Sequence, residues 1–277
     1  MTNLLWLYDL SDFWFCLIVV GATSFVGVAG LVPARILLKR YLYKTGHKNE
    51  VVSYFLAAIG VFYGITLGLI AIGSWEQFSD VQSNVSDEAA IAGSLYRDLS
   101  QFPEPARTRL HDELRQYIVA TIEKSWPGMQ RGENPREVTE LLSRFTDHLG
   151  AFEPASAREQ VLFAEVQRQL NRMTEMRRRR IEAIASNMPG AVWVMVYAGA
   201  FINIAICWLF MIDSFRLHAL LVWKMSALIG LLLFVTLELD RPFRGDLSIG
   251  PDAFKLVHDD IMMAPDQVPR ATARGDK

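Results

Sequence analysis

Cysteine and histidine are scarce in this sequence, and no familiar catalytic motif is present. Its 277 residues include two cysteines and five histidines. Cys16 and Cys207 both fall inside apolar runs, so we interpret them as small buried hydrophobes rather than as a disulfide or a CxxC site. The histidines form no HExxH or ExxH pair, and no GxSxG, GxxxxGK[ST] or GxGxxG motif occurs. These absences predict a protein that is not an enzyme and has no cofactor and no metal, although a metal site assembled from residues distant in sequence stays open.

Excess charge and strand-like patterning are also missing. The formal net charge is −2, which gives no reason to expect a nucleic-acid partner. No alternation of apolar and polar residues typical of β-strands appears, and no internal repeat is visible. The sequence therefore predicts an all-α fold.

Long apolar runs are what the sequence does have. A helix needs about 20 apolar residues to cross a bilayer core. Four runs meet this length, at approximately 13–38, 51–73, 190–212 and 217–239. We therefore predict an integral membrane protein with four transmembrane helices, in contact with membrane lipids.

The polar stretch between the second and third runs predicts a helical extramembrane domain. The resulting layout has transmembrane helices 1 and 2 in 1–73, the helical domain in 74–188, transmembrane helices 3 and 4 in 189–240, and a turn, short helix and disordered tail in 241–277.

Within the helical domain, the pattern of apolar residues and prolines predicts three helices. The first begins near Pro105 and stops at Pro127-Gly128. The second has Asn134 as its cap and Pro135 at its first helical position. The third, about 155–187, carries the run Arg177 to Arg180, which we interpret as solvated charges paired with Glu175 and Glu182 or, alternatively, as a site for anionic lipid headgroups.

Basic residues predict the orientation in the membrane. The loop after the first span holds Arg35, Lys39, Arg40, Lys44 and Lys48 against the single acid Glu50. Short loops rich in Lys and Arg stay in the cytoplasm. We therefore expect the loop 39–50 to be cytoplasmic and the helical domain to lie on the opposite side, although the basic run at 177–180 argues the reverse.

The second span has two different faces. Gly60, Gly64 and Gly68 recur every four residues, and stripes of small residues let membrane helices pack closely. The residues on the opposite face are apolar apart from one hydroxyl. If the helix continues beyond the membrane, acidic residues follow on the same face. The predicted pore-lining residues are Phe55, Ala58, Phe62, Thr66, Leu69 and Gly73, and the predicted acidic vestibule consists of Glu76, Asp80, Asp87 and Asp98.

Two interpretations of this face remain open. In one, the phenylalanines touch lipid or protein core and the acids are merely solvated. In the other, symmetry copies make Phe62 a hydrophobic constriction, and Glu76 and Asp80 charged rings.

The fourth span ends in "LELDRPFRGD", which contains two acids followed by a rigid turn. Glu238 and Asp240 fall at the expected membrane boundary, where a carboxylate costs far less than at mid-bilayer. We expect Asp240 to pair with Arg241, and Pro242-Phe243 to turn the chain against the helical domain. The alternative places the acids in an ion path.

Two segments resemble the bestrophins. "FYGITLGLIAIGSWEQF" is similar to their second span, with Phe62, Tyr63, Trp75, Gln77 and Phe78 at the matching positions and about one extra helical turn between the halves. "DRPFRGD" resembles their segment after the fourth span, with Pro242, Phe243, Gly245 and Asp246 matching and Arg244 inserted. The whole chain is still more similar to a bestrophin-like family of bacteria and plants.

The resemblance implies a pentameric ion channel in an inner (plasma) membrane, with second helices that line a hydrophobic neck. Phe62 would occupy an aromatic neck position, and Ala58 stands where a second bulky neck residue is expected. Bestrophins keep the central domain in the cytosol, which conflicts with the basic loop. Only Asp246 and Asp252 remain of their acidic calcium-binding run, too few for an oxygen cage of about six ligands.

We therefore expect a homo-oligomeric channel for inorganic ions, with a preference for cations because of the acidic rings. The alternative is a non-conducting membrane scaffold or sensor whose helical domain binds a partner.

Overall fold

The computed structural model describes all residues except 1–7, 9, 42–48, 186–187 and 264–277. The chain forms two compact units, one made of residues 1–80 and 186–249 and the other of residues 81–185 and 250–277. The boundaries predicted after residues 73 and 188 concern the membrane and extramembrane parts of the chain and stay a prediction. The segment after Gly250 belongs to the second unit. The basic loop residues Lys44 and Lys48 and the predicted disordered tail lie outside the described residues.

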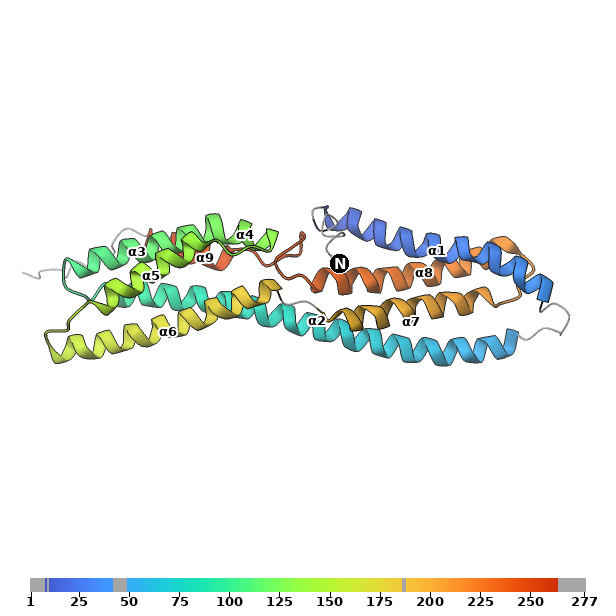
Figure 1. Cartoon of the computed structure of the whole chain (residues 1–277), viewed down its shortest axis with the longest axis horizontal. Coiled ribbons are helices and arrows are strands. Elements are labelled where there is room, and N and C mark those ends of the chain that lie inside the picture. The colour runs from blue at the N-terminus through green and yellow to red at the C-terminus, as the bar shows by residue number, and fades with distance from the viewer. Residues whose placement is uncertain (1–7, 9, 42–48, 186–187, 264–277) are drawn as a thin grey trace, which may run out of the picture. The chain divides into compact units, whose positions relative to one another are not determined.

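Every regular element among the described residues is a helix, as predicted (Figure 1). Four of the helices are long and apolar enough to cross a membrane. These are α1 (Asp12–Tyr41), α2 (Asn49–Leu99), α7 (Gly190–Trp208) and α8 (Phe215–Leu239). Helix α2 extends well past the predicted span, and α7 ends at Trp208 rather than at 212.

Glycines of α1 and α8 allow the helices of the first unit to approach closely. A Cβ on Gly230 of α8 would lie 2.9 Å from the Cα of Val20 in α1, and one on Gly27 would lie 2.1 Å from the Ser226 Oγ. Gly27 also accepts a hydrogen bond of 2.7 Å from the Trp208 Nε1, through its carbonyl oxygen. Close packing between α1, α7 and α8 therefore depends on small residues of α1 and α8.

Tyr63 is a central contact between α2 and α7. The ring of Tyr63 covers Gly199, where a Cβ would lie 2.5 Å from the ring. The Tyr63 hydroxyl donates to the carbonyl oxygen of Val196 at 3.2 Å. Buried apolar residues of α2, α7 and α8 complete this core: Leu67, Trp193, Val196, Ala200, Ile204, Ile229 and Leu233.

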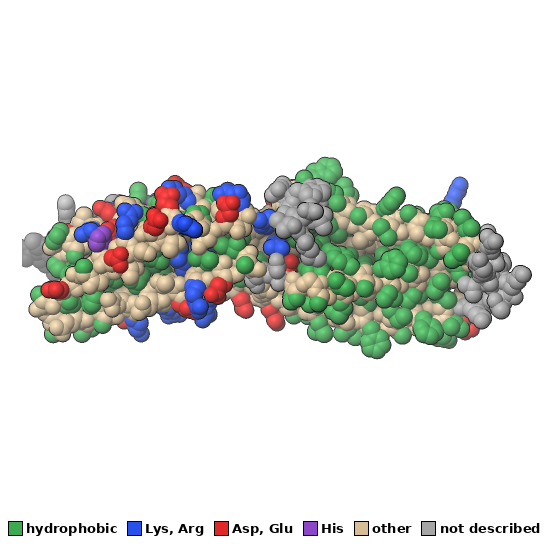
Figure 2. Space-filling view, in the orientation of Figure 1, with side chains coloured by type: hydrophobic (Ala, Val, Ile, Leu, Met, Phe, Trp, Pro, Cys, Tyr) green, Lys and Arg blue, Asp and Glu red, His purple; other side chains and the backbone are tan. Residues whose placement is uncertain are grey.

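The second unit packs shorter helices on the last part of α2. They are α3 (Ala106–Ala120), α4 (Trp126–Arg131), α5 (Arg136–Gly150), α6 (Ala157–Ala185) and α9 (Asp252–Val257). Apolar residues at helical spacing form its core, among them Leu95, Leu110, Leu114, Phe145, Val166 and Leu170. Lys, Arg, Asp and Glu side chains are scattered over the visible face of this unit, whereas hydrophobic side chains predominate on that of the membrane helices (Figure 2).

Two predicted helix boundaries are wrong. Pro127-Gly128 does not stop the helix, because a π-helical turn (Thr121–Ser125) leads into α4 and leaves Pro127 in its first turn, where a missing N–H is tolerated. The chain turns at Gly132 instead, with a φ of 83°. Helix α5 begins one residue later than predicted, with the extended Pro135, not Asn134, at the capping position.

The basic run in α6 divides in a way that its spacing did not reveal. Arg178 and Arg179 pair with Glu175 on the surface, as predicted. Arg177 and Arg180 are buried. The guanidinium of Arg180 contacts both carboxylate oxygens of Glu88, at 2.7 and 3.0 Å. The solvated interpretation is therefore wrong for half of the run.

An aromatic and polar shell encloses the Arg180–Glu88 ion pair. The Tyr117 hydroxyl donates to Glu88 at 3.3 Å, and the guanidinium of Arg180 lies 5.1 and 5.6 Å from the ring centroids of Trp126 and Phe254. Burial alone would lower the pKa of Arg180, but the charge of Glu88 and the hydrogen bonds to it keep that pKa above its ordinary value. Burial raises the pKa of Tyr117 to about 12. The ion pair therefore ties α2 to α6, and the contact of Arg180 with Phe254 adds α9.

Candidate functional site

Helix α2 is the least buried of the four apolar helices. In the most apolar 18-residue stretch of each helix, 6% of the residues are buried in α2, against 22% in α1 and 33% in both α7 and α8. Phe55, Phe62 and Leu69 project from α2 with exposed fractions of 62%, 74% and 65%. Each is seven positions from the next, which places them on one side of the helix about two turns apart. A continuous apolar face of α2 therefore lacks contacts within the chain.

The other predicted pore-lining residues lie on the same face. Ala58 and Gly73 are exposed, and no atom lies within 4 Å of a Cβ placed on Gly73. The Thr66 hydroxyl donates to the carbonyl oxygen of Phe62 at 2.8 Å, so its proton is engaged with the backbone of its own helix. The face offers one hydroxyl oxygen among otherwise apolar surface. Its assignment to a pore stays a prediction.

The glycine stripe of α2, formed by Gly60, Gly64 and Gly68, makes few contacts with the rest of the chain. A Cβ on Gly60 would lie 3.6 Å from the Asn203 Oδ1. A Cβ on Gly64 or Gly68 would have no other atom of the chain within 4 Å. These two glycines are exposed. A packing role for them therefore requires a surface from outside this chain.

Charge appears on the exposed face of α2 only after the apolar stretch. No charged residue occurs from Val51 to Trp75. Glu76 and Asp80 follow, both exposed and without an ion pair to any described residue. Asp80 lies five turns beyond Phe62 on the same side, since 18 residues complete five turns. These two acids keep an uncompensated negative charge.

Asp87 and Asp98 differ from the first two acids. Asp98 accepts a hydrogen bond of 2.7 Å from the Gln169 Nε2. Asp87 lines a polar pocket of about 500 Å³ together with Glu165, Arg168 and Arg172 of α6. Two arginines balance two carboxylates there, and Arg168 also pairs with Glu165 at 2.5 Å. Two of the four acids of the predicted vestibule therefore have partners from α6: arginines lie near Asp87, and Gln169 donates a hydrogen bond to Asp98.

Two acids near Pro242, Asp240 and Asp246, accept hydrogen bonds that hold the turn after α8 in place. Asp240 accepts a hydrogen bond of 2.7 Å from the Met188 backbone N–H, and its Oδ2 lies 4.0 Å from the Arg241 Nε. Asp246 and Asp12 each donate a backbone N–H to the other's carboxylate, at 3.2 and 3.1 Å. Both acids fasten the turn to neighbouring segments.

The remaining residues of this turn form its packed interior. Phe243 is 3% exposed, and Pro242 is buried. Gly245 has a φ of 84°, and a Cβ there would lie 2.9 Å from the Glu238 Oε2. Glycine suits both this left-handed conformation and the close approach. Glu238 itself is buried, and among the described residues no three His, Cys, Asp or Glu side chains are arranged to hold a metal ion.

Comparison with known proteins identifies the family. The model of the bestrophin-like domain matches residues 16–254. The chain belongs to the bestrophin-like family. No match was found among curated proteins.

Solved structures share the fold of this bestrophin-like protein at low sequence identity. Two mutant structures of a bacterial bestrophin homologue from Klebsiella pneumoniae superpose with TM-scores of 0.68 and 0.66. They are 15% and 14% identical to this chain, and the matches cover 88% and 89% of it and 99% of each homologue. A crystal structure described as a membrane protein gives a TM-score of 0.66 at 14% identity, over 86% of this chain and 97% of the other. The family and the four apolar helices indicate an integral membrane protein.

Sequence reasoning missed two features of this bestrophin-like protein that shape the candidate face. Glu88 was not singled out in the sequence, yet it is buried whereas Asp87 is exposed, because adjacent helical residues differ by about 100°. The arginines beside Asp87 come from α6, about 80 residues away in sequence. The helical position of Glu88, in line with Leu67, Ser74 and Val85 on the buried side, was the signal that could have separated it from the acidic face.

Proposed function

We propose that this bestrophin-like protein is a homo-oligomeric ion channel whose pore is lined by α2. The observation that carries the proposal is the exposed face of α2, which passes from Phe55, Phe62 and Leu69 to Glu76 and Asp80 without in-chain partners. Rings of apolar side chains form hydrophobic constrictions, and rings of carboxylates select cations. Family membership supports this assignment, and a pentamer is the subunit number that the bestrophin resemblance implies.

Oligomerisation follows from the small number of spans. In the described part of the chain, Leu67, Trp193 and Leu233 fill the core between the helices of this unit, so an ion path is expected between copies and not within one. Copies arranged around an axis would bring the α2 faces together. The exposed Gly64 and Gly68 then offer a close-packing surface to the neighbouring copy.

The preference for cations rests on Glu76 and Asp80. Their charge is not balanced by an ion pair to a described residue, whereas the arginines of α6 balance the charge around Asp87. Repeated carboxylates in a narrow vestibule raise the local concentration of cations. Asp87 and Asp98 contribute less to this effect.

The double variant Glu76→Gln/Asp80→Asn tests both conduction and selectivity. In planar bilayers the purified protein should give unitary currents, and the double variant should have a lower permeability of cations relative to chloride. The difference should shrink at high salt, since the Debye length falls to about 3 Å at 1 M. Reversal potentials under a salt gradient measure it.

The matched control is Glu140→Gln/Asp147→Asn, which removes two exposed acids of α5. This control should keep the reversal potential of the original protein. Equal reversal potentials in both double variants would assign Glu76 and Asp80 to a solvated surface. A protein that stays electrically silent under all conditions would instead support the scaffold interpretation.

Gly64→Leu should weaken assembly without unfolding the chain. No atom lies within 4 Å of a Cβ at Gly64, so leucine fits the single chain but enters the surface that a neighbouring copy would need. Light scattering in mild detergent should show a pentamer-sized particle for the original protein and smaller species for the variant. Gly21→Leu in α1 is the control, because Gly21 has equally open surroundings. A wild-type protein that is monomeric in mild detergent would contradict the channel proposal.

A further inference from the structure

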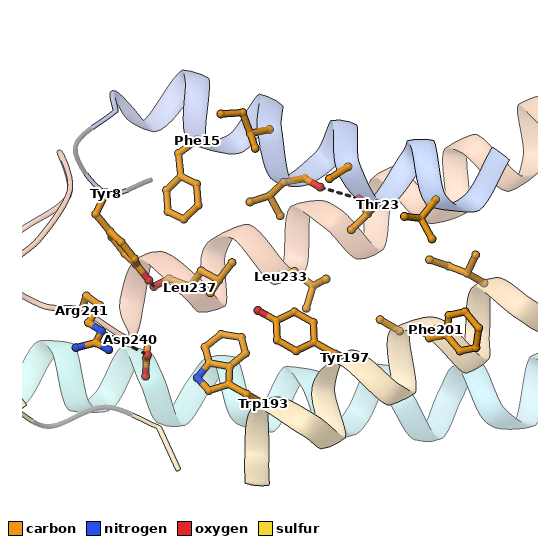
Figure 3. Close-up of a pocket in the computed structure, with 16 residues that line it drawn as sticks. Tyr8, Phe15, Thr23, Trp193, Tyr197, Phe201, Leu233, Leu237, Asp240 and Arg241 are labelled. Atoms are coloured by element: carbon orange, nitrogen blue, oxygen red, sulfur yellow. Dashed lines mark hydrogen bonds and ion pairs between the residues drawn. The ribbon is translucent and has the colours of Figure 1, made fainter. Parts of the chain in front are cut away.

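An open groove lies between α1, α7 and α8 in the membrane unit (Figure 3), and no residue of α2 is among those that line it. Its volume is about 420 Å³, within the range of about 300–1,000 Å³ typical of small-molecule sites. Most of its lining is apolar, with Phe15 and Val26 from α1, Trp193 and Phe201 from α7, and Leu233 and Leu237 from α8. In a bilayer, lipid chains are the molecules that surround such a groove.

One end of the groove is polar. Tyr8, Asp240 and Arg241 gather there, next to the last turn of α8, which ends at Leu239 (Figure 3). This position is where a membrane span of α8 finishes, so the polar end faces the headgroup region if the helix crosses the bilayer. The groove therefore has the same order of chemistry as a membrane lipid, with an apolar length and a charged end.

The three polar side chains are not equally available to a ligand. The Tyr8 hydroxyl donates to the carbonyl oxygen of Leu237 at 3.0 Å. Asp240 accepts hydrogen bonds from the Met188 backbone and the Trp193 side chain. Arg241 has only one ion-pair contact to a described residue, its Nε at 4.0 Å from the Asp240 Oδ2, and it is partly exposed. The Arg241 guanidinium thus retains donors for an anionic group, whereas the carboxylate of Asp240 is already used.

We propose that this groove binds a phospholipid, with one acyl chain along the apolar wall and the phosphate on Arg241. A guanidinium presents a fork of N–H donors that matches the oxygens of a phosphate. The occupied carboxylate beside it disfavours a cationic amphiphile as the ligand. The site is independent of the proposed channel function, because none of the groove residues belongs to α2.

Two pairs of variants test the two parts of the site. Ala22→Trp places a large ring in the groove from the exposed side of α1, and Ala29→Trp puts the same ring on α1 outside the groove. Arg241→Gln removes the phosphate donor, and Arg244→Gln is its control in the same turn, outside the groove. A thermal melt of each variant shows whether it is folded.

Native mass spectrometry of delipidated protein in detergent measures binding of phosphatidylglycerol and of diacylglycerol, which lacks the phosphate. Arg241→Gln should weaken phosphatidylglycerol binding about tenfold, as expected for a charge-assisted hydrogen bond, and leave diacylglycerol binding unchanged. Ala22→Trp should reduce binding of both lipids. The two controls should bind both lipids as the original protein does.

Three results would overturn the proposal. Equal phosphatidylglycerol binding in Ala22→Trp and Ala29→Trp would mean that only annular lipid is bound. Equal loss of phosphatidylglycerol and diacylglycerol binding in Arg241→Gln would mean that Arg241 does not bind the phosphate. A smaller oligomer in Ala22→Trp with unchanged lipid binding would show that a second copy of the chain, and not a lipid, covers the groove. Should Ala22→Trp fail to fold, the Arg241 and Arg244 pair decides.

Discussion

Phe62→Ala is expected to give a channel that conducts constitutively at nearly unchanged ion selectivity. A ring of phenylalanines disfavours water in a narrow neck, and such a constriction can close a pore by dewetting. Ala58, one turn away on the same face, is already small and would not replace it. Selectivity should persist because Glu76 and Asp80 lie further along the helix. Single-channel recording of open probability and reversal potential measures both effects.

The exposure of Phe62 sharpens this test. Burial of Phe62 in the chain would make truncation to alanine cost about 3–5 kcal/mol. Phe62 is 74% exposed, so the stability of the folded chain should change by less than about 0.5 kcal/mol. Phe25→Ala in α1 is the matched control, since Phe25 is 73% exposed and lies outside α2. A folded Phe62→Ala protein with the open probability of the Phe25→Ala control would rule out the neck assignment.

Arg180→Met is expected to destabilise the helical unit by about 3–5 kcal/mol, because it leaves Glu88 as an uncompensated buried charge. Both side chains of the pair are fully buried. The apparent melting temperature, followed by circular dichroism of the full chain in detergent, should fall by roughly 10 °C. Arg179→Met is the control on the surface of α6 and should change stability by less than about 0.5 kcal/mol.

The double variant Glu88→Gln/Arg180→Met separates lost charge pairing from lost packing. A neutral glutamine removes the unpaired charge, so the double variant should recover part of the stability lost in Arg180→Met. The Trp126 and Phe254 rings would retain an apolar neighbour in methionine. If Arg180→Met melted at the same temperature as Arg179→Met, the ion pair would not hold α2 to α6.

The candidate face of α2 was visible in the sequence because it depends on one helix only. The positions of Phe55, Phe62, Glu76 and Asp80 on a shared side follow from helical periodicity, and the absence of charge from Val51 to Trp75 defines where the apolar part ends. The structure adds that this side lacks partners in the chain. Whether a pore covers it is a property of the assembly, which the periodicity of one chain does not contain.

The all-helical fold, the four apolar spans and the bestrophin-like family could be predicted from the sequence, since each depends on local hydrophobic patterning or on short motifs. Which charges are buried, balanced or free could not be predicted, because it depends on how the helices pack. Arg180 pairs with Glu88, which is 92 residues away in sequence, and Asp246 donates a hydrogen bond to Asp12, which is 234 residues away. The three-dimensional structure also shows that Gly27 and Gly230 allow close packing within the chain, whereas Gly64 has no in-chain neighbour within 4 Å of its Cβ position. The physical reason is that burial and ion pairing depend on neighbours in space, which helical spacing along one segment does not specify.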